Sequence, residues 1–133
     1  MLSDTEKITI NLSPMDIGHI DLLVEQGFYA NRTDLIKVAI RNQIDKHSDD
    51  IKNIHIHKYY VLGVLELTSS NLMSKLASGE KMDIKLIGKL TIHDDVEMDL
   101  LIKTINSVRV YGIIKASPSV KKWVQSLMRK EGR

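Results

Sequence analysis

A lone short strand at the start of the chain most constrains what this sequence can fold into. The segment KITINL, residues 7–12, alternates between polar and apolar side chains, as the two-residue period of a β-strand requires. One face of this strand carries Ile8, Ile10 and Leu12. The pattern of the next residues is helical, so the strand has no partner nearby in the chain. Because a single short strand is not stable alone, we expect two chains to pair their strands into a two-stranded ribbon.

Two amphipathic helices are expected after the strand. Ser13 and Pro14 offer an N-cap hydroxyl and a proline at the first helical position, and Gly27 marks the end of the first helix. Asn31 begins the second helix, with Asp34 three residues later as a shortened form of the capping box. Apolar residues recur at helical spacing in both segments: Ile17, Ile20, Leu23 and Val24, then Leu35, Ile36, Ala39, Ile40 and Ile44.

The second face of the strand is small, polar and able to form hydrogen bonds. It carries Lys7, Thr9 and Asn11. A protein core has no use for such a face, whereas base-pair edges in the DNA major groove present donors and acceptors, and that groove admits a two-stranded ribbon. The alternative is a small dimerisation module whose polar strand face is only solvated. The order of strand, cap, glycine turn and second cap favours the DNA-binding interpretation.

The strand Lys-Ile-Thr-Ile-Asn-Leu and a second-helix start of the form Gly27-x-x-x-Asn31-Arg32-Thr33-Asp34-x-Ile36 resemble the ribbon-helix-helix DNA-binding domain of the MetJ/Arc/CopG class. The resemblance covers about a third of the chain. In that class two chains intertwine, the paired strands enter the major groove, and the start of the second helix holds a backbone phosphate. The resemblance therefore implies an obligate homodimer bound to double-stranded DNA. It assigns base reading to Lys7, Thr9 and Asn11, and phosphate binding to Asn31, Arg32 and Thr33.

The charge of the N-terminal part gives no independent support for DNA binding. Through His47 there are five Lys or Arg and seven Asp or Glu, whereas the remainder has fourteen and ten. Phosphate attraction usually dominates the non-specific affinity of proteins for DNA. The DNA-binding interpretation therefore depends on the sequence pattern.

The second half of the chain contains three similar segments, each with a glycine flanked by alternating aliphatic residues. The glycines, at 63, 88 and 112, are 25 and 24 residues apart. A helix start follows each strand at the same offset, at Ser69, Asp94 and Pro118. A strand and a helix repeating at this period predict a three-rung parallel sheet backed by helices, with a solenoid-like stack.

An ordinary three-stranded α/β domain is the alternative to this stack, with the same β-α-β-α-β-α order and coincidental glycines. In either case the end strands have to be capped or paired. The terminal helix, which contains Trp123, is expected to be one cap, and a subunit contact along an open edge is another.

These patterns predict three segments along the chain. Residues 1–47 form the ribbon-helix-helix DNA-binding and dimerisation domain, and residues 48–58 form a linker, because His47-Ser48-Asp49-Asp50 breaks the helical pattern. Residues 59–133 form an α/β repeat domain for assembly or partner binding. The expected fold class is an α+β ribbon-helix-helix dimer followed by a small α/β domain with three β-α repeats.

Histidine pairs are the main candidates for a metal site. His55-x-His57 would place two rings on one side of a strand, and the nickel-responsive NikR repressors also use a His-x-His in a C-terminal sensor domain. The chain has no cysteine ligand and a different order of elements, so we expect linker histidines and no metal. His93-Asp94-Asp95 is explained by helix capping.

No enzyme or cofactor motif is present in the sequence. It lacks G-x-x-x-x-G-K-[ST], G-x-S-x-G and H-E-x-x-H. No apolar run approaches the ~20 residues of a membrane span, and the N-terminus MLSDTEK lacks a signal-peptide core, which predicts a cytoplasmic protein.

We therefore expect a sequence-specific DNA-binding transcriptional regulator, a repressor, whose C-terminal domain makes a higher oligomer. One alternative is the antitoxin of a toxin–antitoxin pair, which usually has a short disordered tail, whereas residues 59–128 are patterned to fold. The other is an architectural, filament-forming DNA-binding protein.

Overall fold

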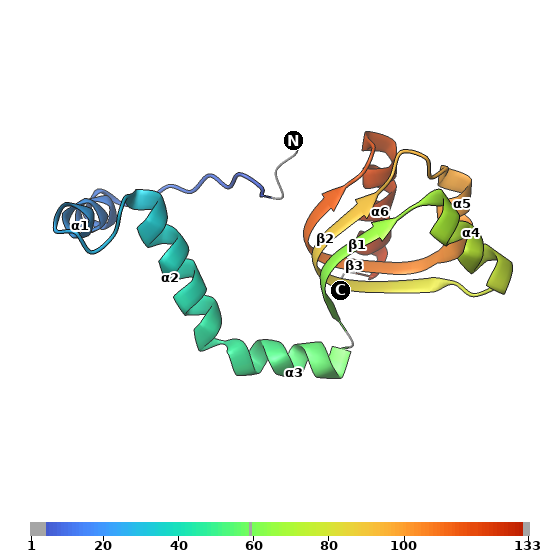
Figure 1. Ribbon diagram of the computed structural model, residues 1–133, viewed down its shortest axis with the longest axis horizontal. Coiled ribbons are helices and arrows are strands. Elements are labelled where there is room, and N and C mark those ends of the chain that lie inside the picture. Colours follow the sequence, from blue (N-terminus) through green and yellow to red (C-terminus); the bar gives the residue numbers. More distant parts are fainter. Residues whose placement is uncertain (1–4, 59, 132–133) are drawn as a thin grey trace. The chain divides into compact units, whose positions relative to one another are not determined.

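The computed structural model describes residues 5–58 and 60–131, without the side chains of 55–58 and 131 (Figure 1). The chain divides into two compact units, Met1–Asn53 and Ile54–Arg133. Along the described residues, three helices precede an alternation of strands and helices.

The two helices of the first unit begin and end at the residues that the sequence predicts. Helix α1 spans Pro14–Glu25, and its N-cap Ser13 accepts a hydrogen bond at Oγ from the Asp16 N–H at 3.1 Å. Two hydrogen bonds of 3.0 Å cap the carbonyls at the end of the helix. The Gly27 N–H donates to the Val24 carbonyl, and the Phe28 N–H donates to the Leu23 carbonyl. Gly27 has a φ of 88°, so it supplies the left-handed residue that this ending requires.

Helix α2 spans Arg32–Lys46 and begins with a reciprocal cap. Asn31 Oδ1 accepts from the Asp34 N–H at 2.8 Å, and Asp34 Oδ2 accepts from the Ala30 N–H at 3.0 Å. The predicted capping role of Asp34 is therefore confirmed, although its carboxylate reaches Ala30 and not the N-cap residue itself.

Helix α3, Ser48–Lys58, occupies the segment that was expected to be a linker. The break at His47 is only local, because the Ile51 N–H donates to the His47 carbonyl at 2.9 Å and starts a new helix. Asp49 and Asp50 lie in the first turn of α3, where negative charge is favourable. The polar cluster that suggested a linker is thus the start of a helix.

The second unit contains one parallel sheet with the strand order β1-β2-β3, as the sequence predicts. The strands are β1 (Val61–Leu67), β2 (Met82–Ile92) and β3 (Ile105–Lys115). Gly63 lies beside Gly88, which lies beside Gly112. All three glycines have positive φ, between 129° and 142°, and β2 and β3 curve strongly along their length (Figure 1). Each curved strand thus has near its middle a conformation that only glycine adopts readily.

The core lies on one face of this sheet. Alternate residues of the two longer strands are buried there, together with residues of the helices: Ile84, Leu86, Leu90, Ile92, Val108, Val110, Leu72, Leu101, Val120 and Val124.

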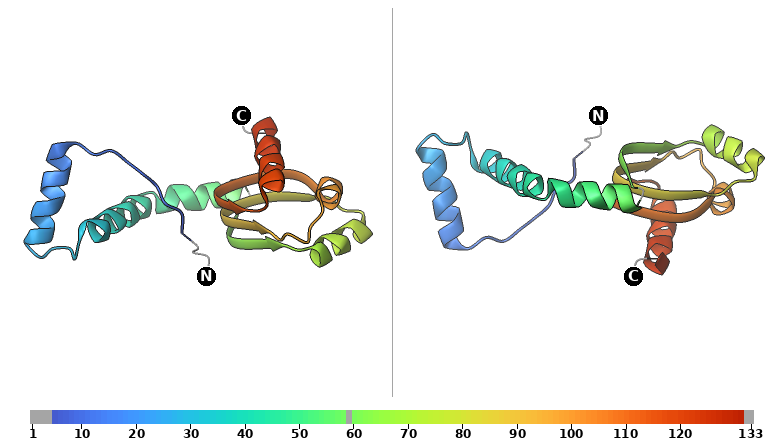
Figure 2. Two further views of the ribbon diagram at one scale, coloured as in Figure 1. Left: turned by 90° about the horizontal axis from the view of Figure 1, so that it is seen from above. Right: turned by 90° about the horizontal axis from the view of Figure 1, so that it is seen from below.

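The helices of the second unit are placed differently from one another. Helices α4 (Ser69–Ser78) and α5 (Met98–Thr104) pack together beyond the carboxyl ends of the strands and do not back the sheet, in contrast to the prediction (Figures 1 and 2). Helix α6, Pro118–Glu131, packs against β3 and buries Val124 completely. The terminal helix is therefore a cap for that strand.

One predicted helix start in this unit is wrong. Asp94 and Asp95 form a turn, and α5 begins at Met98 with Glu97 as its N-cap residue. The equal offset therefore does not hold for the second rung. Among the described residues, no helix is both long and apolar enough to cross a membrane.

Candidate nucleic-acid interface

The described residues of the first unit form no buried hydrophobic core of their own. No residue of α1 or α2 is buried, and Ile8 and Ile10 in the N-terminal segment are 79% and 59% exposed. The described residues of this segment, 5–13, pair with no strand in the single chain. A unit with this much exposed apolar surface needs a further surface to cover it.

The N-terminal segment turns one apolar side towards the helices. An open hollow of about 170 Å³ is lined by Ile10, Leu12, Ile17, Ile20, Arg32 and Ile36. Lys7, Thr9 and Asn11 alternate with these apolar residues and are exposed. The sequence predicts that the segment has one polar and one apolar side. The exposed polar side chains and the apolar lining of the hollow are compatible with that prediction.

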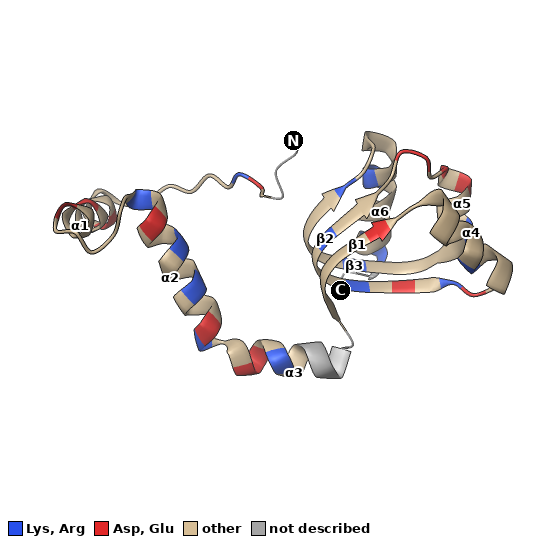
Figure 3. Ribbon diagram, viewed as in Figure 1, with Lys and Arg blue, Asp and Glu red and all other residues tan. Residues whose placement is uncertain are grey.

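The start of α2 carries the three residues expected to hold phosphate. Asn31, Arg32 and Thr33 are exposed there, and Asn31 already caps the Asp34 N–H. Asp34 is the negative side chain in this first turn, and Figure 3 shows basic and acidic residues interspersed along the whole helix. The helix surface is therefore mixed in charge and is not a basic stripe.

Arg32 has a partner that the sequence pattern did not indicate. Its Nε and Nη2 donate to the Asp21 carboxylate of α1 at 2.7 and 2.8 Å, in a bidentate ion pair. The hydrogen bond from Arg32 lowers the pKa of Asp21, and the same bond raises the pKa of Arg32. The pair uses two of the five guanidinium N–H donors, so donors remain for an anion. The two residues lie on different helices, so no local sequence spacing indicates their contact.

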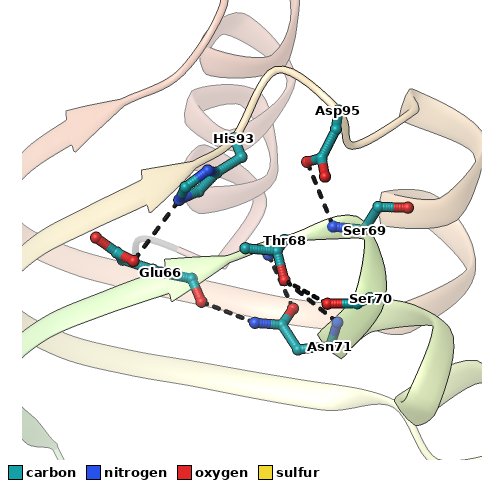
Figure 4. A network of polar contacts seen from close by, with 7 residues as sticks. All are labelled: Glu66, Thr68, Ser69, Ser70, Asn71, His93 and Asp95. Carbon is teal, nitrogen blue, oxygen red and sulfur yellow. Dashed lines mark hydrogen bonds and ion pairs between the residues drawn. The ribbon is translucent and has the colours of Figure 1, made fainter.

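A polar network lies at the carboxyl ends of β1 and β2 (Figure 4). Thr68 and Asn71 form a capping box, in which Thr68 Oγ1 accepts from the Asn71 N–H at 3.3 Å and Asn71 Oδ1 accepts from the Thr68 N–H at 2.9 Å. The Ser69 N–H donates to Asp95 Oδ1 at 3.4 Å, and His93 Nε2 lies 3.6 Å from Glu66 Oε2. Capping thus explains part of His93-Asp94-Asp95, but the helix capped is α4.

The His-x-His pair does not lie in a strand. His55 and His57 fall within α3, and their side chains are outside the described residues. The prediction that a strand places both rings on one side is therefore wrong, because residues two apart on a helix do not face each other. No group of three or more His, Cys, Asp or Glu in the described part of the chain could hold a metal ion.

The segment predicted to be a strand forms no strand in the single chain, and two capped helices joined by a glycine turn follow it. This order of a segment with alternating polar and apolar residues and two helices is that of the ribbon-helix-helix class of proteins. The chain belongs to the Ribbon-Helix-Helix transcriptional regulator family, whose model matches residues 3–121. The match therefore includes all three strands of the second unit as well as the first unit.

A transcriptional regulator of Halobacterium salinarum, CdrS, is 34% identical to this chain over 44 residues. The aligned region covers 33% of this chain and 80% of that relative. No solved structure matches the chain.

Proposed function

We propose that this transcriptional regulator is a homodimer that inserts a two-stranded ribbon into the DNA major groove and represses transcription from the site it occupies. The main support is the first unit, in which residues 5–13 pair with no strand and α1 and α2 bury no residue in the single chain. Pairing two such segments would satisfy their backbone groups and cover Ile8, Ile10 and Leu12 together. A dimer held in the groove would exclude other proteins from the same DNA.

The base-reading residues in this proposal are Lys7, Thr9 and Asn11. Their side chains are exposed and therefore accessible to base edges. The apolar Ile10 and Leu12, which alternate with them, instead line the hollow beside the helices. An amide such as that of Asn11 can bind adenine through two hydrogen bonds, and a lysine favours guanine. The three side chains therefore offer a mixed set of donors and acceptors to a short half-site.

The phosphate-binding residues in this proposal are Asn31, Arg32 and Thr33. The free N–H groups at the start of α2 and the positive end of its dipole favour an anion. Asp21 would hold the Arg32 guanidinium in a fixed orientation while leaving some of its donors for a phosphate oxygen. Such contacts would set the position of the ribbon without reading sequence.

The second unit would mediate assembly between copies of the chain. Its support is the exposed apolar surface of β1, where Val61, Leu62 and Val64 are each more than 60% exposed. The same surface favours one alternative, an architectural protein whose second unit polymerises along DNA. An antitoxin is less favoured, because this unit has its own buried core and is not a short tail.

Selection of bound sites from random DNA tests the proposal. We expect an inverted or tandem repeat of short half-sites. Asn11→Ala and Thr9→Ala should each lose about 1 to 3 kcal/mol of discrimination at one base position. Asn42→Ala, an exposed asparagine on α2, is the matched control and should leave the selected site unchanged. Unaltered selectivity in both ribbon variants would show that another surface reads the DNA.

A further inference from the structure

Strand β1 has the sequence of an inner strand, although it lies at the edge of the sheet. The segment Val61–Leu67 reads VLGVLEL, with one charged residue, Glu66, and no lysine or proline. Side chains on both of its faces are exposed, with Val61 at 64%, Leu62 at 70% and Val64 at 67%. Exposed edge strands usually carry lysine, proline or a bulge that prevents further pairing. Strand β1 lacks both lysine and proline and is apolar on both faces, as strands covered on both sides are.

The opposite edge of the sheet is covered within the same chain. Helix α6 packs against β3, with Val120 and Val124 buried. Figure 2 shows β1 and α4 on the side of β2 that faces away from α6. Among the described residues, no element provides an equivalent cover for β1.

Helix α4, which follows β1 in the chain, also has exposed apolar residues. Met73 and Leu76 on this helix are 56% and 41% exposed. The charged residues nearby are few, and Lys75 is paired with Glu80 at 3.6 Å. A nearly neutral, apolar surface of this kind does not suit DNA, but it fits an equally apolar surface.

The backbone of β1 indicates which residues can accept a partner strand. The Leu67 carbonyl accepts from the His93 N–H at 3.0 Å, so the backbone groups of Leu67 face β2. Because the direction of these groups alternates along a strand, those of Leu62, Val64 and Glu66 face outward. The Glu66 carbonyl is already bonded to Asn71 Nδ2 at 3.1 Å. Leu62 and Val64 are therefore the residues best placed to bind a further strand.

We propose that β1 pairs antiparallel with β1 of a second copy, so that Leu62 of each copy lies opposite Val64 of the other. The two sheets then become one six-stranded sheet. The contact is self-complementary, as a two-fold axis through Gly63 requires. This inference rests on the proposed assembly function of the second unit. Because ribbon pairing of the first units would hold two chains together, the second unit of one chain would meet that of the other at an effective concentration on the order of millimolar.

Disulfide trapping in the full chain tests this register, because the sequence contains no native cysteine. Leu62→Cys and Val64→Cys chains are prepared separately and also refolded as a mixture. In the proposed pairing the two different cysteines are opposite, with Cα atoms about 5.5 Å apart, which a disulfide can bridge. On mild oxidation the mixture should give a linked chain pair at least tenfold faster than either variant alone. Ile102→Cys on α5, with a side chain that is 49% exposed in the native protein, is the control for random collision.

Linking in the mixture no faster than in the Ile102→Cys control would overturn the proposal, as would faster linking of either single variant. Hydrogen exchange of the unmodified chain gives a second test that no substitution can disturb. The outward amides of Leu62 and Val64 should exchange about 100-fold more slowly than free amides, and rapid exchange would also overturn the pairing. Site selection by the unmodified chain tests DNA binding separately. Specific DNA binding without the cross-link would therefore reject the strand pairing alone.

Discussion

Gly88 lies directly beside Gly63 in the parallel sheet, and a Cβ built on Gly88 would be 2.0 Å from the Gly63 carbonyl oxygen. The relationship repeats one strand further on, where a Cβ on Gly112 would be 1.9 Å from the Gly88 carbonyl oxygen. The three glycines therefore form a column in which the backbone of Gly63 occupies the space of a side chain on Gly88, and the backbone of Gly88 occupies that of a side chain on Gly112.

Gly88→Ala should destabilise the second unit by about 3 kcal/mol or more, because it adds a backbone clash to the strain of a positive φ. Gly63→Ala is the matched control. Gly63 has a φ of 135°, but a Cβ on this residue would meet nothing within 4 Å, so only the conformational strain applies. Urea unfolding of both variants measures the difference. Equal losses of stability would show that the close approach contributes nothing.

Arg32→Ala should weaken binding to all DNA sequences alike, since the proposed phosphate contact carries no base information. The slope of log affinity against log salt should fall by about 1. Titrations of a selected and a scrambled site at several salt concentrations measure both effects. Lys122→Ala on α6 is a charge-matched control outside the first unit. A loss confined to the selected site would contradict a phosphate-binding role for Arg32.

A fragment ending at Lys58 should fold only as a dimer, because α1 and α2 bury no side chain in a single chain. Its melting temperature should rise with protein concentration, as mass action requires for a folded state that needs two chains. Calorimetry over a hundredfold range of concentration, with sedimentation at each end, would measure this. A monomeric fragment with a constant melting temperature would exclude the paired ribbon.

The stability of the second unit should depend on pH through Asp83. Its Oδ1 accepts from Ser107 Oγ at 2.6 Å and from Asn106 Nδ2 at 2.9 Å, and these bonds lower the pKa of Asp83 below its ordinary value of 3.8. A lowered pKa in the folded state favours folding above pH 3.8, and this contribution is lost as the pH falls through the folded-state pKa.

Ser107→Ala should raise the pKa of Asp83 towards 3.8, and its cost in unfolding free energy should shrink between about pH 7 and about pH 3. Carboxyl NMR titration and urea unfolding measure the two quantities. Ser126→Ala is the control, because Ser126 Oγ donates to the neutral Trp123 carbonyl at 3.0 Å. A pH-independent cost for Ser107→Ala would mean that its bond to Asp83 makes no contribution.

Removing residues 59–133 should flatten the binding isotherm on DNA with several sites more than it weakens binding to one pair of half-sites. Contacts between neighbouring dimers typically add about 1 to 3 kcal/mol of coupling. Quantitative footprinting on one-site and two-site DNA separates the two effects. Equal cooperativity with and without the second unit would direct attention to a ligand or a different protein partner.

Local sequence signals predicted most of the element starts. Ser13, Gly27 and Asn31 act as caps or turns through atoms only a few residues away, so their roles follow from the sequence itself. The glycine spacing predicted the parallel sheet because one glycine recurs in each strand. Helix α3 was not predicted, and the reason for this is also local. The acidic residues after His47 suit the start of a helix as well as they suit a linker.

Contacts between distant residues could not be predicted from spacing. The Asp21–Arg32 pair joins two helices, and Asp95 hydrogen-bonds to the start of α4 and not to the helix that follows it. The placement of α4 and α5 beyond the strand ends depends on how the strands curve, which their apolar pattern does not specify.

The glycine column also limits how the gene for this protein can change in length. Adding or deleting one codon within β2 would move Gly88 out of line with both neighbours and place a side chain against a carbonyl oxygen. The same change in a connection can be absorbed, and the unequal intervals of 25 and 24 residues between the glycines show that connections do differ. Related genes should therefore vary in length between the strands while keeping the three glycine codons in register.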